Sequence, residues 1–193
     1  MVKEKNKDEH FERYKKRYKD FETLEADTLA INLVKPNSKV LSCGCGHGRE
    51  VSFLVKERNC IVTAIDNQEK MINLSRKVEP NADYYLSDMK YFKTRENQDY
   101  ILCIWNGINA LLKNEDKIKF IKTSEENLKI GGKLILVTSN MFSYWKHFLS
   151  ELKHRNNYNY FPRVIKSWFK DTNFEVQKIK VGRFNIIVAR KIK

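Results

Sequence analysis

The stretch VLSCGCGHGRE, residues 40–50, places Gly44, Gly46 and Gly48 between an apolar run and a charged one. A loop with so few side chains lets the backbone turn sharply and approach a ligand closely. It is not the GxGxxG of a dinucleotide site, because Arg49 stands where the third glycine is needed, and it lacks the lysine of a Walker loop. Both phosphate-binding interpretations are therefore weakened, and a nicotinamide-binding oxidoreductase remains a distant alternative.

Short apolar runs alternate with helix-like runs along most of the chain. The expected strands are residues 39–43, 60–65, 82–86, 100–105, 133–138, 174–181 and 184–190. The expected helices between them are residues 49–58, 68–78 and 115–129, the last ended by Gly131 and Gly132. The last two strands flank Gly182 and Arg183, which is typical of a hairpin. This order predicts an α/β fold: a Rossmann-like, doubly wound, mostly parallel seven-stranded sheet with a C-terminal antiparallel β hairpin.

The length of 193 residues fits a single domain, 1–193. Within it we expect a helical N-terminal cap over residues 1–35 and an aromatic and basic insert over residues 140–172. No apolar run reaches the ~18 residues of a membrane-spanning helix, and the first residues lack the apolar core of a secretory signal, so we expect a cytoplasmic protein without a membrane partner. The four cysteines form no CxxC pair, and we predict buried thiols and no metal site.

Two acids follow the second and third expected strands. Asp66 ends CIVTAID, twenty residues after Gly46, where a carboxylate can accept both hydroxyls of a ribose. Asp88 and Met89 follow the next strand, where an acid and an apolar side chain suit an adenine amino group and ring. Each acid alone is equally well explained as a helix N-cap. Together with the glycine loop, they indicate an adenosine-containing ligand.

At this point the chain resembles the class I S-adenosylmethionine-dependent methyltransferases, in the branch that acts on small molecules and mixed substrates. The segments that carry the resemblance stand in the family's order and spacing: VLSCGCGHGRE, VTAIDNQEKMINLSRK, LSDMKYF, QDYILCIWNGINALL and NLKIGGKLILVTSN. The resemblance runs from about Val40 to Thr138. It implies a methyltransferase whose cofactor is S-adenosylmethionine.

The resemblance also implies a set of cofactor-binding residues. The loop from Gly44 through Cys45 and Gly46 to Gly48 would pass the methionine portion, and Asp66 would bind the ribose diol. The remaining contacts implied are Asn67 and Met71 beside the adenine, Asp88 on its amino group, Met89 over its ring, and Ile104 to Asn106 near the methyl donor.

Ser42 marks a departure from the family pattern. The family often has an acid at this position, which helps to orient the loop and the amino-acid end of the cofactor. A serine can still form a hydrogen bond there, but without charge. Ser42 thus counts among the cofactor-binding residues, and a non-catalytic protein on the same fold is one alternative.

The acceptor is expected to be a small molecule. Methylases of exocyclic base amines usually have an Asn/Asp-Pro-Pro-aromatic run after the fourth strand, whereas residues 104–109 are IWNGIN. In residues 140–170, nine aromatic residues are interleaved with six Lys/Arg, which suits a planar or anionic acceptor, although an amphipathic lid explains the same pattern. Methyl transfer needs mainly alignment, so the catalytic residue is unknown, with Asn106, Tyr14 and His147 as candidates.

The charge of the chain keeps RNA open as a partner. The net charge is +13, and residues 140–193 hold twelve Lys/Arg and three Asp/Glu, a balance of 12 − 3 = +9. Such a field favours anionic partners, and an RNA or nucleoprotein methyltransferase is therefore the second hypothesis, although a solvated surface has the same composition. The acceptor, the methylated atom and the oligomeric state do not follow from the sequence.

Overall fold

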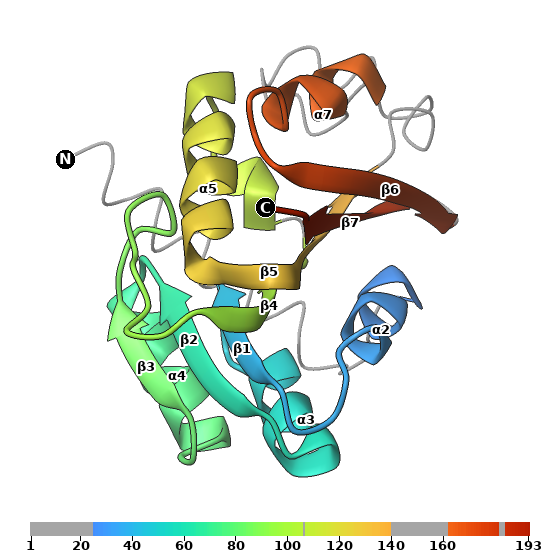
Figure 1. The fold of residues 1–193 in the computed structure, drawn as a ribbon. Coiled ribbons are helices and arrows are strands. Elements are labelled where there is room, and N and C mark those ends of the chain that lie inside the picture. Colours follow the sequence, from blue (N-terminus) through green and yellow to red (C-terminus); the bar gives the residue numbers. More distant parts are fainter. Residues whose placement is uncertain (1–24, 106, 140–161, 182–183) are drawn as a thin grey trace, which may run out of the picture.

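A computed structural model describes residues 25–105, 107–139, 162–181 and 184–193 of the chain (Figure 1). Its centre is a seven-stranded sheet in the order β3-β2-β1-β4-β5-β7-β6. The strands are β1 Lys39–Cys43, β2 Ile61–Asp66, β3 Asp83–Leu86, β4 Gln98–Cys103, β5 Leu128–Ser139, β6 Phe174–Val181 and β7 Phe184–Lys191. The helices are α2 Glu25–Asn32, α3 Arg49–Arg58, α4 Glu69–Val78, the 3₁₀ helix η1 Gly107–Ala110, α5 Asn114–Asn127 and α7 Pro162–Trp168.

The strand pairing confirms the predicted fold class. Strands β3, β2, β1, β4 and β5 are parallel neighbours, and β7 runs antiparallel to both β5 and β6. The chain moves outward from β1 to β3 and then returns to place β4 on the other side of β1. The order therefore reverses between β1 and β4, and in sheets of this kind ligands bind beyond the carboxyl ends of the strands at that point.

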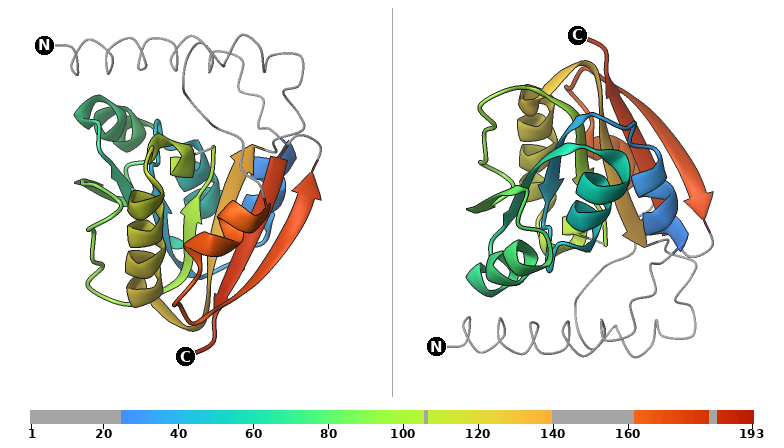
Figure 2. Two further views of the ribbon diagram at one scale, coloured as in Figure 1. Left: turned by 90° about the horizontal axis from the view of Figure 1, so that it is seen from above. Right: turned by 90° about the horizontal axis from the view of Figure 1, so that it is seen from below.

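Helices cover both faces of the sheet (Figure 2). Helices α2, α3 and α4 pack on one face and α5 and α7 on the other. Successive residues of β4 point to opposite faces, so Tyr100 and Leu102 lie in the first core and Ile101 and Cys103 in the second. Among the described residues, none of the helices combines the length and the apolar character needed to cross a membrane.

The end of α5 corrects one expectation. Gly131 and Gly132 were expected to end the helix, but α5 ends at Asn127 and both glycines lie inside β5. The pairing of β4 with β5 shifts between Gln98 and Tyr100. Gly131 has a φ of 80° there, and a Cβ on Gly132 would come within 2.9 Å of the Lys129 carbonyl oxygen. The glycines therefore serve an irregularity in the strand rather than a helix end.

Candidate functional site

The glycine loop connects β1 to α3 at the carboxyl edge of the sheet. Gly44, Gly46 and Gly48 have φ values of 71°, 53° and 84°, in the left-handed region that glycine adopts without steric cost. The N–H groups of Gly44 and Cys45 donate hydrogen bonds of 2.8 and 3.0 Å to the Ile65 carbonyl oxygen. The loop is thereby held against the end of β2.

Helix α4 packs against the loop so closely that a side chain at Gly48 has no room. A Cβ on Gly48 would lie 2.1 Å from Ser75 Oγ and 2.9 Å from Ser75 Cβ. A Cβ on Gly44 would lie an ordinary 3.6 Å from Met89 Cε, so the Met89 side chain lies over this part of the loop. Bare backbone is thus required at Gly48 by packing as well as by φ.

Asp66 at the end of β2 faces the glycine loop. Its Oδ2 accepts a hydrogen bond of 3.0 Å from the Gly46 N–H, and its Oδ1 accepts one of 2.9 Å from the Gln68 N–H. The residue is 7% exposed. Two backbone donors therefore fix the carboxylate between the loop and the start of α4, and carboxylate oxygens have further lone pairs with which to accept from a ligand.

The end of β3 adjoins Asp66. The Ser87 N–H donates to the Asp66 carbonyl oxygen over 2.9 Å, and Asp88 Oδ1 accepts 2.9 Å from the Lys90 N–H. Lys90 Nζ lies 3.5 Å from Asp88 Oδ2 and 3.2 Å from Asp116 Oδ1. Asp88 thus caps its own turn. It is half-exposed and lies beside Lys90, which also pairs with Asp116.

The other residues implied to bind the cofactor differ in exposure. Asn67 is exposed next to Asp66. Cys45, Met71 and Ile104 are buried, with 2%, 2% and 3% of their surface exposed. The catalytic candidates Asn106, Tyr14 and His147 lie outside the described residues, as does most of the insert at 140–172, so their roles remain predictions.

Sequence reasoning missed a carboxylate beneath the loop. Ser42 Oγ donates a hydrogen bond of 2.8 Å to Glu50 Oε1, from the first turn of α3. Ser42 and Glu50 are 2% and 3% exposed. Burial raises the pKa of Glu50 to about 7, against the lowering effect of the Ser42 hydroxyl.

A second buried acid was also missed. Asp27 of α2 is 0% exposed, and its Oδ1 accepts 2.9 Å from the Trp105 N–H. Trp105, expected to end a strand, has a φ of 55° and lies beyond the end of β4. Burial raises the pKa of Asp27 to about 6, although the Trp105 N–H and Arg49 act to lower it. We call Asp27 and Glu50 the acid pair.

Arg49 connects these residues to the loop after β4. Its guanidinium carbon lies 3.5 Å from the centroid of the Trp105 ring, a stacking geometry favourable for a cation. Its charge acts on both Asp27 and Glu50, and Asp27 in turn raises the pKa of Glu50. The acid pair, Arg49 and Trp105 therefore form one electrostatic cluster, in which the acids are buried and Arg49 and Trp105 are half-buried.

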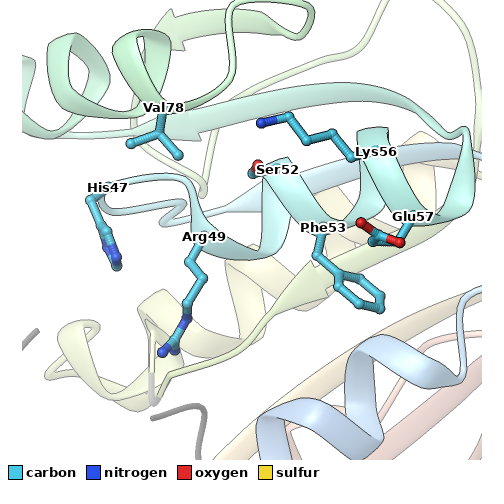
Figure 3. Close-up of a pocket in the computed structure, with 7 residues that line it drawn as sticks. All are labelled: His47, Arg49, Ser52, Phe53, Lys56, Glu57 and Val78. Atoms are coloured by element: carbon cyan, nitrogen blue, oxygen red, sulfur yellow. The ribbon is translucent and has the colours of Figure 1, made fainter. Parts of the chain in front are cut away.

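A pocket of about 260 Å³ runs along the outer side of α3 (Figure 3). It is lined by His47, Arg49, Ser52, Phe53, Lys56, Glu57 and Val78. In Figure 3 the side chains of His47 and Arg49 both extend away from Val78. The pocket shares these two residues with the end of the loop, but its lining includes none of Gly44, Gly46 and Asp66. We therefore do not assign it the adenosine ligand.

The arrangement as a whole suits an adenosine bound across the carboxyl edge. The loop offers bare backbone, Asp66 offers a fixed acceptor beside it, and Met89 offers an apolar surface.

A model of the methyltransferase domain family matches residues 40–132 of the chain. A carboxy-S-adenosyl-L-methionine synthase of Shewanella loihica is 33% identical over 146 residues, 68% of this chain and 59% of that protein. The chain thus spans less than two thirds of this relative.

Solved structures show the same fold at low identity. A TehB-like SAM-dependent methyltransferase from Corynebacterium glutamicum has a TM-score of 0.73 and 16% identity, over 94% of this chain and 98% of that one. The N-methyltransferase NodS from Bradyrhizobium japonicum has a TM-score of 0.65 and 16% identity, over 95% and 97%. At such identities the likeness concerns the fold alone.

Proposed function

Because this chain belongs to the class I S-adenosylmethionine-dependent methyltransferases, we propose that it transfers the methyl group of S-adenosylmethionine to a small-molecule acceptor. The observation that carries the proposal is the hydrogen bond of 3.0 Å from the Gly46 N–H to Asp66 Oδ2. This bond holds the glycine loop and Asp66 next to each other at the carboxyl edge of the sheet, as a bound adenosyl group requires.

The chemistry asks little of the protein beyond alignment. The sulfonium is a good leaving group, so an acceptor lone pair displaces it in line as the new bond to the methyl carbon forms. Proximity and orientation supply up to ~7–11 kcal/mol of such a barrier. A general base is needed only when the acceptor must lose its proton early. The residues that hold the cofactor therefore matter more than a catalytic triad.

A small molecule is the proposed acceptor because residues 104–109, IWNGIN, lack the Pro-Pro motif of base-amine methylases. The test is incubation of the protein with S-adenosylmethionine carrying an isotopic label in its methyl group, together with either a metabolite extract or total RNA. We expect protein-dependent label in the metabolite fraction. Label confined to RNA would overturn the proposed acceptor.

A second candidate function follows from the Shewanella relative, which is a carboxy-S-adenosyl-L-methionine synthase. Here a carboxyl group from a second, carboxyl-donating substrate would replace a hydrogen of the cofactor, and no methyl group would leave it. Mass spectrometry of the nucleoside products separates the two reactions: methyl transfer yields S-adenosylhomocysteine, and the synthase reaction, given a carboxyl donor, yields a cofactor heavier by the mass of CO₂. The identity of 33% favours testing both.

RNA methylation stays an outcome of the same tests. If the basic C-terminal region bound nucleic acid, affinity would fall steeply with salt, with a log–log slope of about −0.7 per neutralised phosphate on single strands. A flat salt response would remove that alternative.

The four cysteines are free and buried. This is expected of thiols in a reducing compartment, and it supports the cytoplasm as the proposed location.

A further inference from the structure

The starting point is the missing acid at the end of β1. Ser42 stands where the family often carries a carboxylate, and yet the structure places one at the same spot. Glu50 comes from the first turn of α3, and its Oε1 accepts the Ser42 hydroxyl over 2.8 Å. A carboxyl group therefore lies beside Ser42, although it belongs to a residue eight positions further along the chain.

The second observation is an unused acceptor atom on Asp27. Its Oδ1 is engaged by the Trp105 N–H, whereas its buried Oδ2 accepts no hydrogen bond from the residues that the structure describes. Asp27 is 0% exposed, so this oxygen is closed to bulk water in the ligand-free protein, and a ligand reaches it only when the groups that cover it move. A buried carboxylate oxygen left in this way costs stability unless a donor is supplied.

The raised pKa values of the two buried carboxyl groups also favour a cation as the ligand of this cluster. Burial raises the pKa of Glu50 to about 7 and that of Asp27 to about 6, and Arg49 only partly offsets this effect. The Arg49 guanidinium is at the same time stacked on Trp105. A further positive group that donates hydrogen bonds would stabilise both carboxylates in their charged form.

The place of the cluster identifies that group. Ser42 is one residue from the end of β1, Trp105 follows β4, and Glu50 lies two residues after the glycine loop. The switch point of the sheet lies between these strands, and the family resemblance places the methionine portion of the cofactor along this loop. That portion carries an α-ammonium group, a compact cation with three donors.

We propose that Asp27 and Glu50 together bind the α-ammonium group of the cofactor, with Ser42 as the positioning residue for Glu50. The proposal rests on the proposed function, because it assumes that S-adenosylmethionine is the ligand. In this arrangement Asp27 of α2 and Glu50 of α3 supply the negative charge that Ser42 of β1 lacks.

Three ligands, compared in acid-to-amide variants, test the ammonium contact in calorimetric titrations; 5′-methylthioadenosine lacks the whole amino-acid chain, of which the ammonium is the group that a carboxylate attracts. S-Adenosylmethionine carries both the ammonium and the sulfonium, S-adenosylhomocysteine carries the ammonium alone, and 5′-methylthioadenosine carries neither. We expect Glu50→Gln and Asp27→Asn each to raise the Kd of the first two ligands by about tenfold to a hundredfold. The Kd of 5′-methylthioadenosine should change less than about threefold. Glu57→Gln, an exposed acid on the same helix, should change none of them.

A rescue variant tests whether the charge itself matters. Ser42→Asp in the Glu50→Gln background returns a carboxylate to the strand position, and we expect it to recover most of the lost affinity for S-adenosylhomocysteine. Equal losses for all three ligands, or a loss for S-adenosylmethionine alone, would overturn the proposal, since the first indicates a merely structural role and the second a contact with the sulfonium. Failure of the proposed function looks different: none of the three ligands would bind the unaltered protein.

Discussion

The N–H of Gly46 donates a hydrogen bond of 3.0 Å to Asp66 Oδ2, across twenty residues of sequence. This bond joins the loop after β1 to the acid at the end of β2, and it fixes the conformation of both. The carboxylate accepts a second N–H, from Gln68, on its other oxygen. Asp66 is therefore held by the fold itself, in the position from which it would accept the ribose hydroxyls.

Replacing Asp66 with Asn should weaken both stability and cofactor binding. An amide presents one acceptor and one NH₂ donor, so either the Gly46 or the Gln68 N–H would face a donor. We expect a loss of about 1–3 kcal/mol in the free energy of unfolding and at least a tenfold rise in the Kd of S-adenosylhomocysteine, on the order of 1.4 kcal/mol. Denaturant unfolding and calorimetry measure the two. Asp83→Asn, at an exposed position of β3, should leave both unchanged; a similar loss there would contradict this account.

Replacing Gly48 with Ala should destabilise the protein more than replacing Gly131 with Ala. Both glycines have positive φ, 84° and 80°, but a Cβ at Gly48 meets Ser75 Oγ at 2.1 Å while a Cβ at Gly131 meets nothing within 4 Å. The two share the conformational cost of ~1–2 kcal/mol, and Gly48→Ala adds an overpacking cost of ~1–3 kcal/mol. Thermal unfolding of the two variants measures the difference. Equal losses would mean that α4 moves aside freely.

Much of this site follows from the sequence because its signals are local. The three glycines precede an amphipathic helix, and Asp66 ends an apolar strand, so each element predicts its own boundaries. The strand at Lys39–Cys43 and the helix at Arg49–Arg58 were predicted with their observed bounds. The mostly parallel sheet and its closing hairpin follow from the alternation of strands and helices, whereas the order of the strands comes from the structure.

The acid pair was not predicted from the sequence, because Asp27 and Glu50 are distant in the chain and only the fold brings them into one cluster. Glu50 lies one residue before Val51 on the buried side of α3, and Asp27 lies between Ala26 and Ala30 on the buried side of α2. A charged residue on an apolar helix face was the available signal. The position of Gly131 and Gly132 inside β5 was missed for a similar reason. A glycine pair is a local signal for a helix end, but here the pairing of β5 with β4 determines the structure.

Glu50→Gln should stabilise the ligand-free protein at neutral pH. Burial raises the pKa of Glu50 from its ordinary 4.5 to about 7, so between these values the folded protein binds more protons than the unfolded chain. Its stability therefore falls as pH rises through this window, and glutamine abolishes that fall. We expect the Tm of the variant to gain on the unaltered protein from about pH 5 to about pH 8. A gain that is independent of pH would contradict the ionisation of Glu50.

That titration depends on what surrounds the Glu50 carboxyl. Arg49 lowers its pKa and Asp27 raises it, and its own charge acts on three further titratable neighbours, namely Cys45, Tyr84 and Cys103. Burial raises the pKa of all three, that of Tyr84 and that of Cys103 each to about 12. They therefore stay neutral over this window, and Asp27 is the neighbour whose titration overlaps. Repeating the comparison in the Asp27→Asn background separates the two acids.

Cofactor binding should release protons near neutral pH if the ligand's ammonium meets the acid pair. At about pH 6.5 the Glu50 carboxyl, with a pKa of about 7, is mostly protonated in the free protein, and a cation placed beside it lowers that pKa. Calorimetry in buffers of different ionisation enthalpy should then report release of about one proton with S-adenosylhomocysteine. The release should be much smaller with 5′-methylthioadenosine, which lacks the ammonium, and in Glu50→Gln. Equal release with both ligands would mean that the protons come from another part of the site, whereas release confined to the ammonium-bearing ligand ties the charge of Glu50 to the group we assign to it.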